Sequence, residues 1–336
     1  MKIYNISGKD YKLPNDLNEF QQEMYIHLVS WKWKYITTEV GYDGSIEYDA
    51  ILPDSFANKY PILYPDILTT FKDHLLKFPF RIHKYFNHMA SSQVANINLF
   101  LPVLIDTSAD NILMQLKSDF KSLAKTELDN GFRIEFWDEP YGNLNDKSNV
   151  SGTDTDIAIA YYDKDDGLCL WLIEHKLTEK EFTECGGYRS KGKKPEHDCS
   201  KNFLDILSNK NLCYYHNVNK YEYWNITDSN KSFFLNNNIF SECPFQKGLN
   251  QLWRNQLLAL SIENDPRQPY KHVFFSVVRH PENRHLDKSI KEYKELIGNN
   301  SKFSTFTSAD VIKAAHTLHN LVIDNWIKWY KELYKL

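Results

Sequence analysis

The sequence lacks the long hydrophobic segments that membrane-spanning and secreted proteins carry. Its first residues, MKIYNISGKDYKLPND, contain no apolar core of a signal peptide, and no apolar run approaches the roughly 18–20 residues that a membrane span needs. Cysteine is also scarce, with five in 336 residues. Without a secretion signal, this argues against a disulfide scaffold and for a reducing compartment. We therefore expect a cytoplasmic protein that does not contact membranes.

A strong charge of either sign is missing as well, since the formal net charge is only -4. That balance does not by itself indicate a nucleic-acid partner, although a sum over the chain hides local basic clusters. With 42% hydrophobic and 25% charged residues, the composition is typical of a globular protein with a sizeable core. No internal repeat or low-complexity linker marks a domain boundary. We expect a helical N-terminal region over 1–90, packed on a core over 91–336.

The periodicity of apolar residues predicts a mixed α/β core. Helical spacing predicts helices over 91–105, 108–131, 247–264 and 308–336. Ser91 and Ser92 are candidate N-caps of the first helix, and Gly131 is a stop signal for the second. Alternating or continuous apolar runs predict strands over 132–139, 156–163, 168–176 and 270–280. The sequence DKDDG joins the second and third strands as a hairpin turn, and 177–246 is a polar insertion with four of the cysteines.

Charged residues stand at one end of this central hairpin. On a strand, residues two apart face the same side, so Glu174 and Lys176 point together and His175 points away. Asp156 lies seven residues before the DKDDG turn begins, and Glu174 lies seven after it ends. The hairpin therefore brings the two carboxylates side by side. A solvated hairpin end with surface charges is the alternative interpretation.

Two carboxylates beside an ammonium group suit the hydrolysis of a phosphodiester bond. Carboxylate oxygens, with a backbone carbonyl, bind a hard cation such as Mg²⁺ (or Mn²⁺), which keeps several of its waters. The metal lowers the pKa of a bound water and neutralises charge on the phosphate. A lysine positions or helps to deprotonate that water, or stabilises the transition state. Asp156 and Glu174 are thus predicted metal ligands, and Lys176 a predicted catalytic residue.

Asp156, followed by Glu174-His175-Lys176, resembles the D…(D/E)-x-K signature of the PD-(D/E)XK nuclease superfamily. The predicted element order over about 91–280 is similar to the core of that superfamily. More narrowly, SSQVANINLF, IEHKLTEKEFTECGGYRS and NQLWRNQLLAL resemble a bacterial branch of restriction endonucleases. The resemblance implies a restriction-endonuclease-like α/β fold: a central mixed β-sheet flanked by helices, with helical additions at both ends and a cysteine-bearing insertion. It also implies a Mg²⁺-dependent endonuclease that acts on DNA in restriction or defence, and it allows a homodimer.

The first acidic ligand has two candidates. Asp156 is favoured because the unbroken apolar strand starts immediately after it, and Asp154 is its rival, two residues earlier on the same strand face. Thr155 stands where the superfamily often has a proline before the first aspartate.

Other polar residues are weaker candidates. Gln251, on the helix that follows the insertion, looks like the counterpart of a glutamine that approaches the metal or the scissile phosphate in several branches of the superfamily. Arg254 is a candidate phosphate contact, unless it belongs to the polar outer face of that helix. Gln93 either reaches the site or is a buried glutamine bonded to backbone, and Glu135 is better explained as a surface charge. A competing function keeps the fold without catalysis, as a nucleic-acid-binding or assembly protein.

The insertion contains the cysteines Cys185, Cys199, Cys213 and Cys243, whereas Cys169 belongs to a strand as a small buried hydrophobe. Clustered thiols in a polar segment suggest a metal site, with Zn²⁺ or an iron–sulfur cluster as the metal. No CxxC pair is present, so scattered free thiols are the alternative, and His197 or His216 could replace a cysteine. The basic run YRSKGKKPEH (188–197) is a candidate phosphate contact or a solvated loop.

Overall fold

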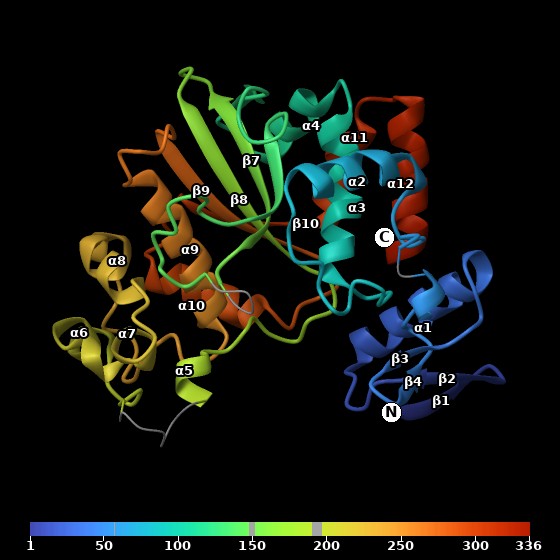
Figure 1. The fold of residues 1–336 in the computed structure, drawn as a ribbon, viewed down its shortest axis with the longest axis horizontal. Coiled ribbons are helices and arrows are strands. Elements are labelled where there is room, and N and C mark those ends of the chain that lie inside the picture. Colours follow the sequence, from blue (N-terminus) through green and yellow to red (C-terminus); the bar gives the residue numbers. More distant parts are fainter. Residues whose placement is uncertain (57, 148–151, 190–196) are drawn as a thin grey trace.

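The centre of the molecule is a mixed β-sheet, as predicted (Figure 1). Within the residues that the computed structural model describes, 1–56, 58–147, 152–189 and 197–336, this sheet has six strands. They are β5 (Phe120–Leu123), β6 (Phe132–Phe136), β7 (Thr155–Asp163), β8 (Leu168–Lys176), β9 (His272–Arg279) and β10 (Phe303–Thr307). Their order is β10-β9-β8-β7-β5. β5 and β6 pair with the same edge of β7, β5 near the end of that strand and β6 near its start. β8, β9 and β10 run parallel, whereas β7 is antiparallel to β8.

The β7–β8 hairpin forms because two apolar strands are joined by a tight turn. Asp163 Oδ1 accepts hydrogen bonds from the backbone N–H groups of Asp165 (2.9 Å) and Gly167 (2.7 Å). The two strands pair in a register that sets Ile157 opposite Ile173. The predicted strands and the hairpin turn are confirmed.

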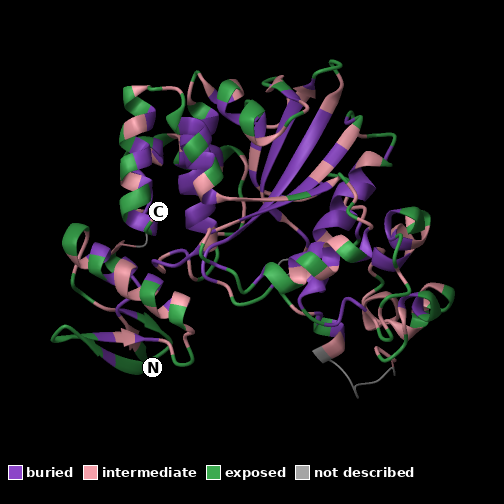
Figure 2. Ribbon diagram, turned by 180° about the vertical axis from the view of Figure 1, so that it is seen from behind, coloured by how far each residue is buried: buried purple, intermediate pink, exposed green. Residues whose placement is uncertain are grey.

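Helices cover both faces of the sheet, and Figure 2 shows the strands as the most deeply buried part. Along β8, Trp171 and Ile173 pack into one core cluster, and Leu170 and Leu172 into the other. The helices of the first cluster include α3 (Ser92–Ile105), α4 (Ala109–Leu116), α11 (Ser308–His316) and α12 (Leu321–Tyr334). Those of the second include α9 (Leu249–Glu263) and α10 (Asp287–Leu296). Burial on both faces explains why β8 is a continuous apolar run.

The predicted helices are confirmed in part. α3 begins after Ser91, whose hydroxyl accepts a hydrogen bond from the Val94 N–H (3.4 Å), and α9 matches its predicted range. The prediction of one helix over 108–131 is wrong, because α4 ends at Leu116 and the chain then pairs with β7 as β5. The predicted C-terminal helix over 308–336 is two helices, since Asn320 accepts a hydrogen bond from the Val322 N–H (3.0 Å) and starts α12 anew. None of the helices in the described part of the chain is long and apolar enough to cross a bilayer.

The sequence predicted a mostly helical N-terminal region, but the structure also has four short strands there. Its first residues form the hairpin β1 (Lys2–Ile6) and β2 (Lys9–Leu13), and a second small sheet joins β3 (Gly41–Asp43) to β4 (Ile46–Tyr48). Ser7 and Gly8 both have positive φ angles (51° and 74°), which suits a two-residue hairpin turn. The helices of this region are α1 (Glu19–Tyr35) and α2 (Leu68–Lys77). Met24 and Phe71 from these helices join the first core cluster, so the region packs on the core.

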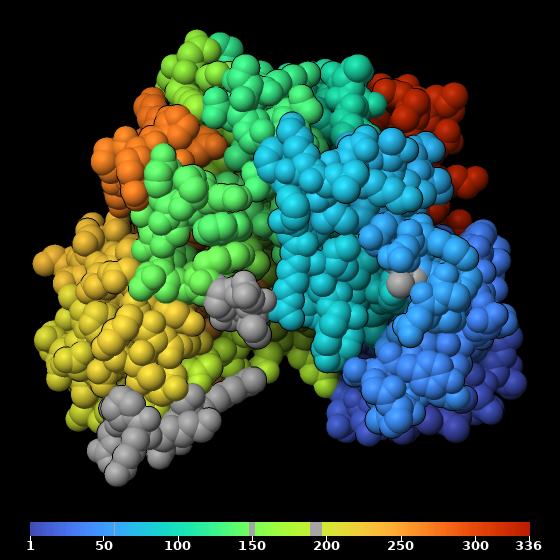
Figure 3. Space-filling view, in the orientation of Figure 1, coloured from blue at the N-terminus to red at the C-terminus, as the bar shows by residue number. Residues whose placement is uncertain are grey.

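The insertion contributes buried aromatic residues to the second core cluster, contrary to its polar appearance. Its helices are α5 (Gly186–Arg189), α6 (Phe203–Ser208), α7 (Tyr214–Asn217) and α8 (Tyr223–Ser229). Phe203, Trp224 and Phe245 are buried, and the Phe245 ring stacks on Trp253 of α9 with centroids 4.0 Å apart. The insertion and the N-terminal region lie on opposite sides of a notch at one edge of the molecule (Figure 3). Most of the basic run 188–197 lies outside the described residues.

Candidate active site

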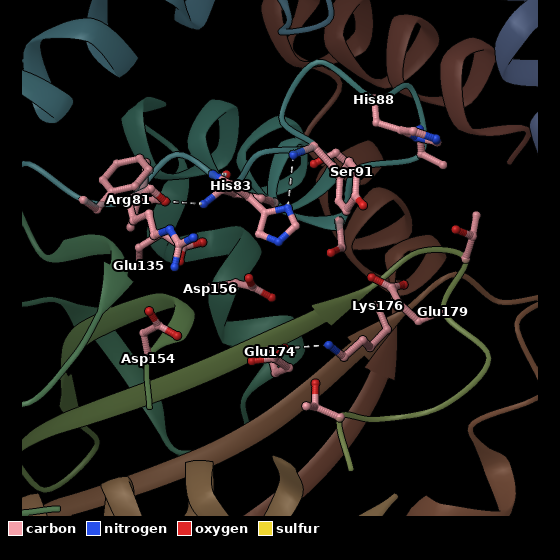
Figure 4. Close-up of a pocket in the computed structure, with 18 of the residues that line it drawn as sticks. Arg81, His83, His88, Ser91, Glu135, Asp154, Asp156, Glu174, Lys176 and Glu179 are labelled. Carbon is pink, nitrogen blue, oxygen red and sulfur yellow. Dashed lines mark hydrogen bonds and ion pairs between the residues drawn. The ribbon is translucent and has the colours of Figure 1, made fainter. Parts of the chain in front are cut away.

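The structure brings Asp156, Glu174 and Lys176 together at one end of the β7–β8 hairpin (Figure 4). The pairing of Ile157 with Ile173 sets Asp156 opposite Glu174 one residue further along. All three side chains line a cavity of about 1000 Å³ between the core and the N-terminal region. Their convergence follows from the strand period of two and the hairpin register, as the sequence predicted.

The carboxylate of Glu174 is held by three side-chain donors. Its Oε1 accepts hydrogen bonds from Lys176 Nζ (2.8 Å) and Gln251 Nε2 (2.6 Å), and its Oε2 accepts one from Asn255 Nδ2 (2.8 Å). Gln251 and Asn255 lie four residues apart on α9 and so share one face of the helix. Gln251 was predicted from sequence and Asn255 was not, although their spacing of four residues on one helix was the available signal. Glu174 is only 5% exposed, so these bonds fix its orientation.

Asp156 is placed at the start of β7 by contacts with two neighbouring elements. Its Oδ2 accepts a hydrogen bond from the His175 N–H (2.5 Å), and its backbone oxygen accepts one from Asn96 Nδ2 of α3 (3.1 Å). Burial, together with the nearby Glu174 carboxylate, raises the pKa of Asp156 well above its ordinary value. Such a carboxylate takes up a proton readily unless a cation compensates its charge.

Asp154 lies beside the same cavity but outside the strand pairing. It precedes β7, and its Oδ2 is 3.8 Å from Lys147 Nζ. Burial raises its pKa as well. The register therefore pairs Asp156, rather than Asp154, with Glu174, and the choice of Asp156 as first ligand stays a prediction.

Glu135 is a carboxylate of this site that the sequence analysis explained wrongly as a surface charge. It interrupts β6 with a φ of 51°, in the left-handed region that costs a non-glycine residue energy. Ile134 and Phe136 on either side pair regularly with β7, so the kink turns Glu135 towards Asp156 (Figure 4). Burial and then the charges of Asp156 and Asp154 raise the pKa of Glu135 well above its ordinary value.

Lys176 is a permanent cation at this site. Burial alone would lower its pKa, but the carboxylates of Glu174, Glu179 and Asp156 outweigh burial and raise it above its ordinary value. The ammonium group is therefore a hydrogen-bond donor and charge partner at neutral pH. Of the three roles that the sequence suggested, positioning water and stabilising the transition state fit this environment, and deprotonating water does not.

Gln93 and Arg254 are engaged in contacts that shape the site. Gln93 Oε1 accepts a hydrogen bond from the His83 N–H (3.0 Å), and its Nε2 donates to the Arg81 oxygen (3.3 Å). This is the backbone-bonded alternative, and Gln93 also lowers the pKa of Glu135, against the larger effect of burial. Arg254 Nε donates to Thr153 Oγ1 (3.0 Å) and Nη2 to the backbone oxygen of residue 152 (2.7 Å). These Arg254 contacts hold the segment that leads into β7.

The acidic residues fit a magnesium ion better than a metal cage. Within the described ranges, no three or more His, Cys, Asp and Glu side chains are preset as a metal-binding group. Mg²⁺ needs only one or two carboxylates and keeps the rest of its shell as water. Asp156 and Glu174 are the candidates for that pair, and Glu135 and Asp154 line the same cavity.

The raised carboxylate pKa values predict how stability depends on pH and metal. Because Asp156 and Glu135 hold protons more tightly when folded, their contribution to stability is full below about pH 4 and falls as pH rises through their folded pKa values. A divalent cation binds the deprotonated form and reverses this loss. In thermal unfolding we expect Mg²⁺ or Ca²⁺ to raise Tm more at about pH 8 than at about pH 5.5. The variant Asp156→Asn should lose most of the difference, and an equal metal effect at both pH values would contradict the prediction.

Comparison with known proteins places the chain in a family. The family model described as restriction endonuclease associating with ARP matches residues 36–335. The chain belongs to this family. The match to this restriction-endonuclease family includes the whole central sheet, the carboxylates Glu135, Asp154, Asp156 and Glu174, and the insertion. The β1–β2 hairpin lies outside it. No curated protein and no solved structure matches the chain.

Proposed function

We propose that the protein is a metal-dependent endonuclease of the PD-(D/E)XK type that hydrolyses DNA phosphodiester bonds, in restriction or defence. The observation that carries the proposal is the cross-strand pair Asp156–Glu174 with Lys176 bonded to Glu174 inside a large cavity. Family membership supports a nuclease-like role. Asp156 and Glu174 are the proposed ligands of Mg²⁺ or Mn²⁺, Lys176 the proposed catalytic cation and Gln251 its assistant.

The chain's own residues then divide the work of hydrolysis. A bound Mg²⁺ would activate a water and neutralise phosphate charge. Lys176 Nζ, already oriented by Glu174, donates to the attacking water or to a phosphate oxygen as negative charge develops there. Gln251 and Asn255 keep the Glu174 carboxylate aimed at the cavity. One bond to phosphorus forms with the water oxygen, and the bond to the departing sugar oxygen breaks.

The cavity walls suit a nucleic-acid backbone and its bases. Arg81, Arg133 and Lys147 contribute positive charge, and Phe78 and Trp137 contribute aromatic surface. The Arg133 guanidinium lies 3.8 Å from the centre of the Phe78 ring, which orders this wall. A homodimer, which would present two such sites, stays a prediction.

Cleavage of supercoiled plasmid tests the proposal directly. We expect nicked or linear DNA with Mg²⁺ or Mn²⁺ and none with EDTA, since the carboxylates need a cation to act on an anionic substrate. RNA of matched length serves as the second substrate. Tight DNA binding without cleavage under any metal would instead favour the binding-protein alternative.

A further inference from the structure

Three backbone contacts bring together the four insertion cysteines, which are far apart in the sequence. The Cys243 N–H donates to the Cys199 oxygen (3.4 Å), and the Cys185 N–H donates to the Gln246 oxygen (3.2 Å). The Asp198 N–H donates to the Leu212 oxygen (2.9 Å), which sets the segment ending in Cys199 beside the one ending in Cys213. The Gln246 side chain also donates to the Cys199 oxygen and so links the first two contacts.

Three of these cysteines start a short loop that curls back over their own sulfur. Backbone N–H groups just after each cysteine lie near its own sulfur: those of Gly187 and Tyr188 at Cys185, those of Tyr215 and His216 at Cys213, and that of Phe245 at Cys243.

The loop at Cys185 has a close approach that explains part of its sequence. A Cβ on Gly187 would lie 3.1 Å from the Tyr214 side chain and 3.4 Å from Cys185 Sγ. Any larger residue there would crowd the loop against α7, whose start is set by Cys213. Gly187 therefore allows the loop after Cys185 to pack closely against the start of α7.

Two imidazoles beside the cysteines provide an independent sign of a ligand. His197 packs its ring 5.2 Å from that of Tyr214, next to Cys213. Within the described part of the chain, neither ring nitrogen of His197 has a hydrogen-bond partner, and Nδ1 of His216 has none either, although all three atoms are buried. Buried imidazole nitrogens are normally paired. A mixed thiolate and imidazole environment is typical of Zn²⁺, whereas iron–sulfur clusters are held mainly by cysteine.

We propose that the insertion binds one structural Zn²⁺ through Cys185, Cys213 and Cys243, with the fourth ligand supplied by the His197–Cys199 segment. The side chains that the structure describes do not form a preset group of three or more ligands. Backbone hydrogen bonds nevertheless hold the segments that carry them next to one another. Since aromatic residues of the insertion already pack with α9 and the sheet in the second core cluster, the ion would fix loop positions rather than create the fold.

The zinc site would also support the candidate active site from outside. The Thr183 N–H donates to Gln251 Oε1 (3.1 Å), and Cys185 follows two residues later. Gln251 in turn donates to Glu174. Fixing Cys185 therefore limits the positions open to Gln251, which gives the insertion a positioning role.

Metal analysis of the full-length protein tests the proposal without any substrate. We expect about one zinc per chain by plasma mass spectrometry, and its loss in Cys213→Ser and Cys243→Ser. Cys169→Ser is the matched control, because Cys169 is a buried strand residue on the other core cluster. His197→Ala and Cys199→Ser assign the fourth ligand, and zinc retained at full occupancy in both would overturn that part of the assignment.

Two further measurements keep the proposal testable if serine variants fail to fold. In wild-type protein, a mercurial that titrates thiols should release zinc in step with thiol modification, as reported by a colour-forming chelator. Cobalt substitution should give the visible bands of a tetrahedral site with a thiolate charge-transfer band. Metal-free protein with freely reacting thiols would overturn the proposal, and so would bound iron with acid-labile sulfide. A zinc site would stand even if no nuclease activity were found.

Discussion

Replacing Glu174 with glutamine is expected to lower metal-dependent DNA cleavage by roughly 10²–10³-fold. The substitution removes one of two proposed metal ligands and the charge that holds Lys176. DNA binding in Ca²⁺, measured by fluorescence anisotropy, should change little, because the cavity walls proposed to contact DNA remain. Single-turnover cleavage rates in Mg²⁺ give the size of the loss.

The controls separate chemistry from folding. Glu174 accepts on both oxygens, so a glutamine must turn its amide N–H₂ towards one donor, at a cost of about 1–3 kcal/mol in stability. Asp156→Asn is a second variant, with the same expected loss of cleavage. Glu181→Gln is the matched control, because Glu181 is an exposed carboxylate in the loop after β8. Cleavage by Glu174→Gln at the rate of Glu181→Gln would refute the site assignment.

Asn255 offers a finer test of the same arrangement. Its side chain contacts Glu174 without lining the cavity wall that would face DNA, so it is a positioning residue. Asn255→Ala should lower kcat by about 10-fold and leave DNA affinity unchanged. Asn264→Ala, at the C-terminal end of the same helix, is its control.

The acidic pair could be predicted from sequence because it depends on local rules. The strand period of two and the DKDDG turn fix which side chains of the hairpin meet, and both are visible in the letters. Glu135 could not be found this way. It reaches the site through a left-handed backbone kink in β6. The sequence predicted a regular strand there, and a regular strand has no such kink.

The prediction of one helix over 108–131 failed because strand pairing between distant parts of the chain outweighed the local helical spacing. Phe120 and Leu123 continue the helical spacing of α4, yet they form β5 because the edge of β7 there offers a partner. The short N-terminal hairpins lack long apolar runs and so resembled irregular chain. The insertion looked polar because its buried residues are scattered aromatics, such as Phe203 and Phe245, that come together only in the fold.

Replacing Glu135 with glycine is expected to raise thermal stability while lowering cleavage. Glycine adopts the φ of 51° at no steric cost, which should recover about 1 kcal/mol relative to alanine at the same position. Both Glu135→Gly and Glu135→Ala remove a partly buried carboxylate whose charged form is disfavoured, so both should exceed wild type in Tm without metal. Differential scanning calorimetry in EDTA measures both effects. The Tm difference between wild type and Glu135→Ala reports loss of the carboxylate, and that between Glu135→Ala and Glu135→Gly reports relief of the backbone strain.

The activity of these Glu135 variants decides whether the strained residue serves the site. If its carboxylate supports the cation, both should cleave plasmid about 10-fold or more slowly and require higher Mg²⁺. His319→Gly is the matched control, because His319 has a similar φ of 50° in the exposed connection between α11 and α12. It should gain stability and keep full cleavage. Full cleavage by Glu135→Gly would leave the kink without a role in catalysis, whereas a stable but slow variant would show that the fold accepts strain in order to place a carboxylate beside Asp156.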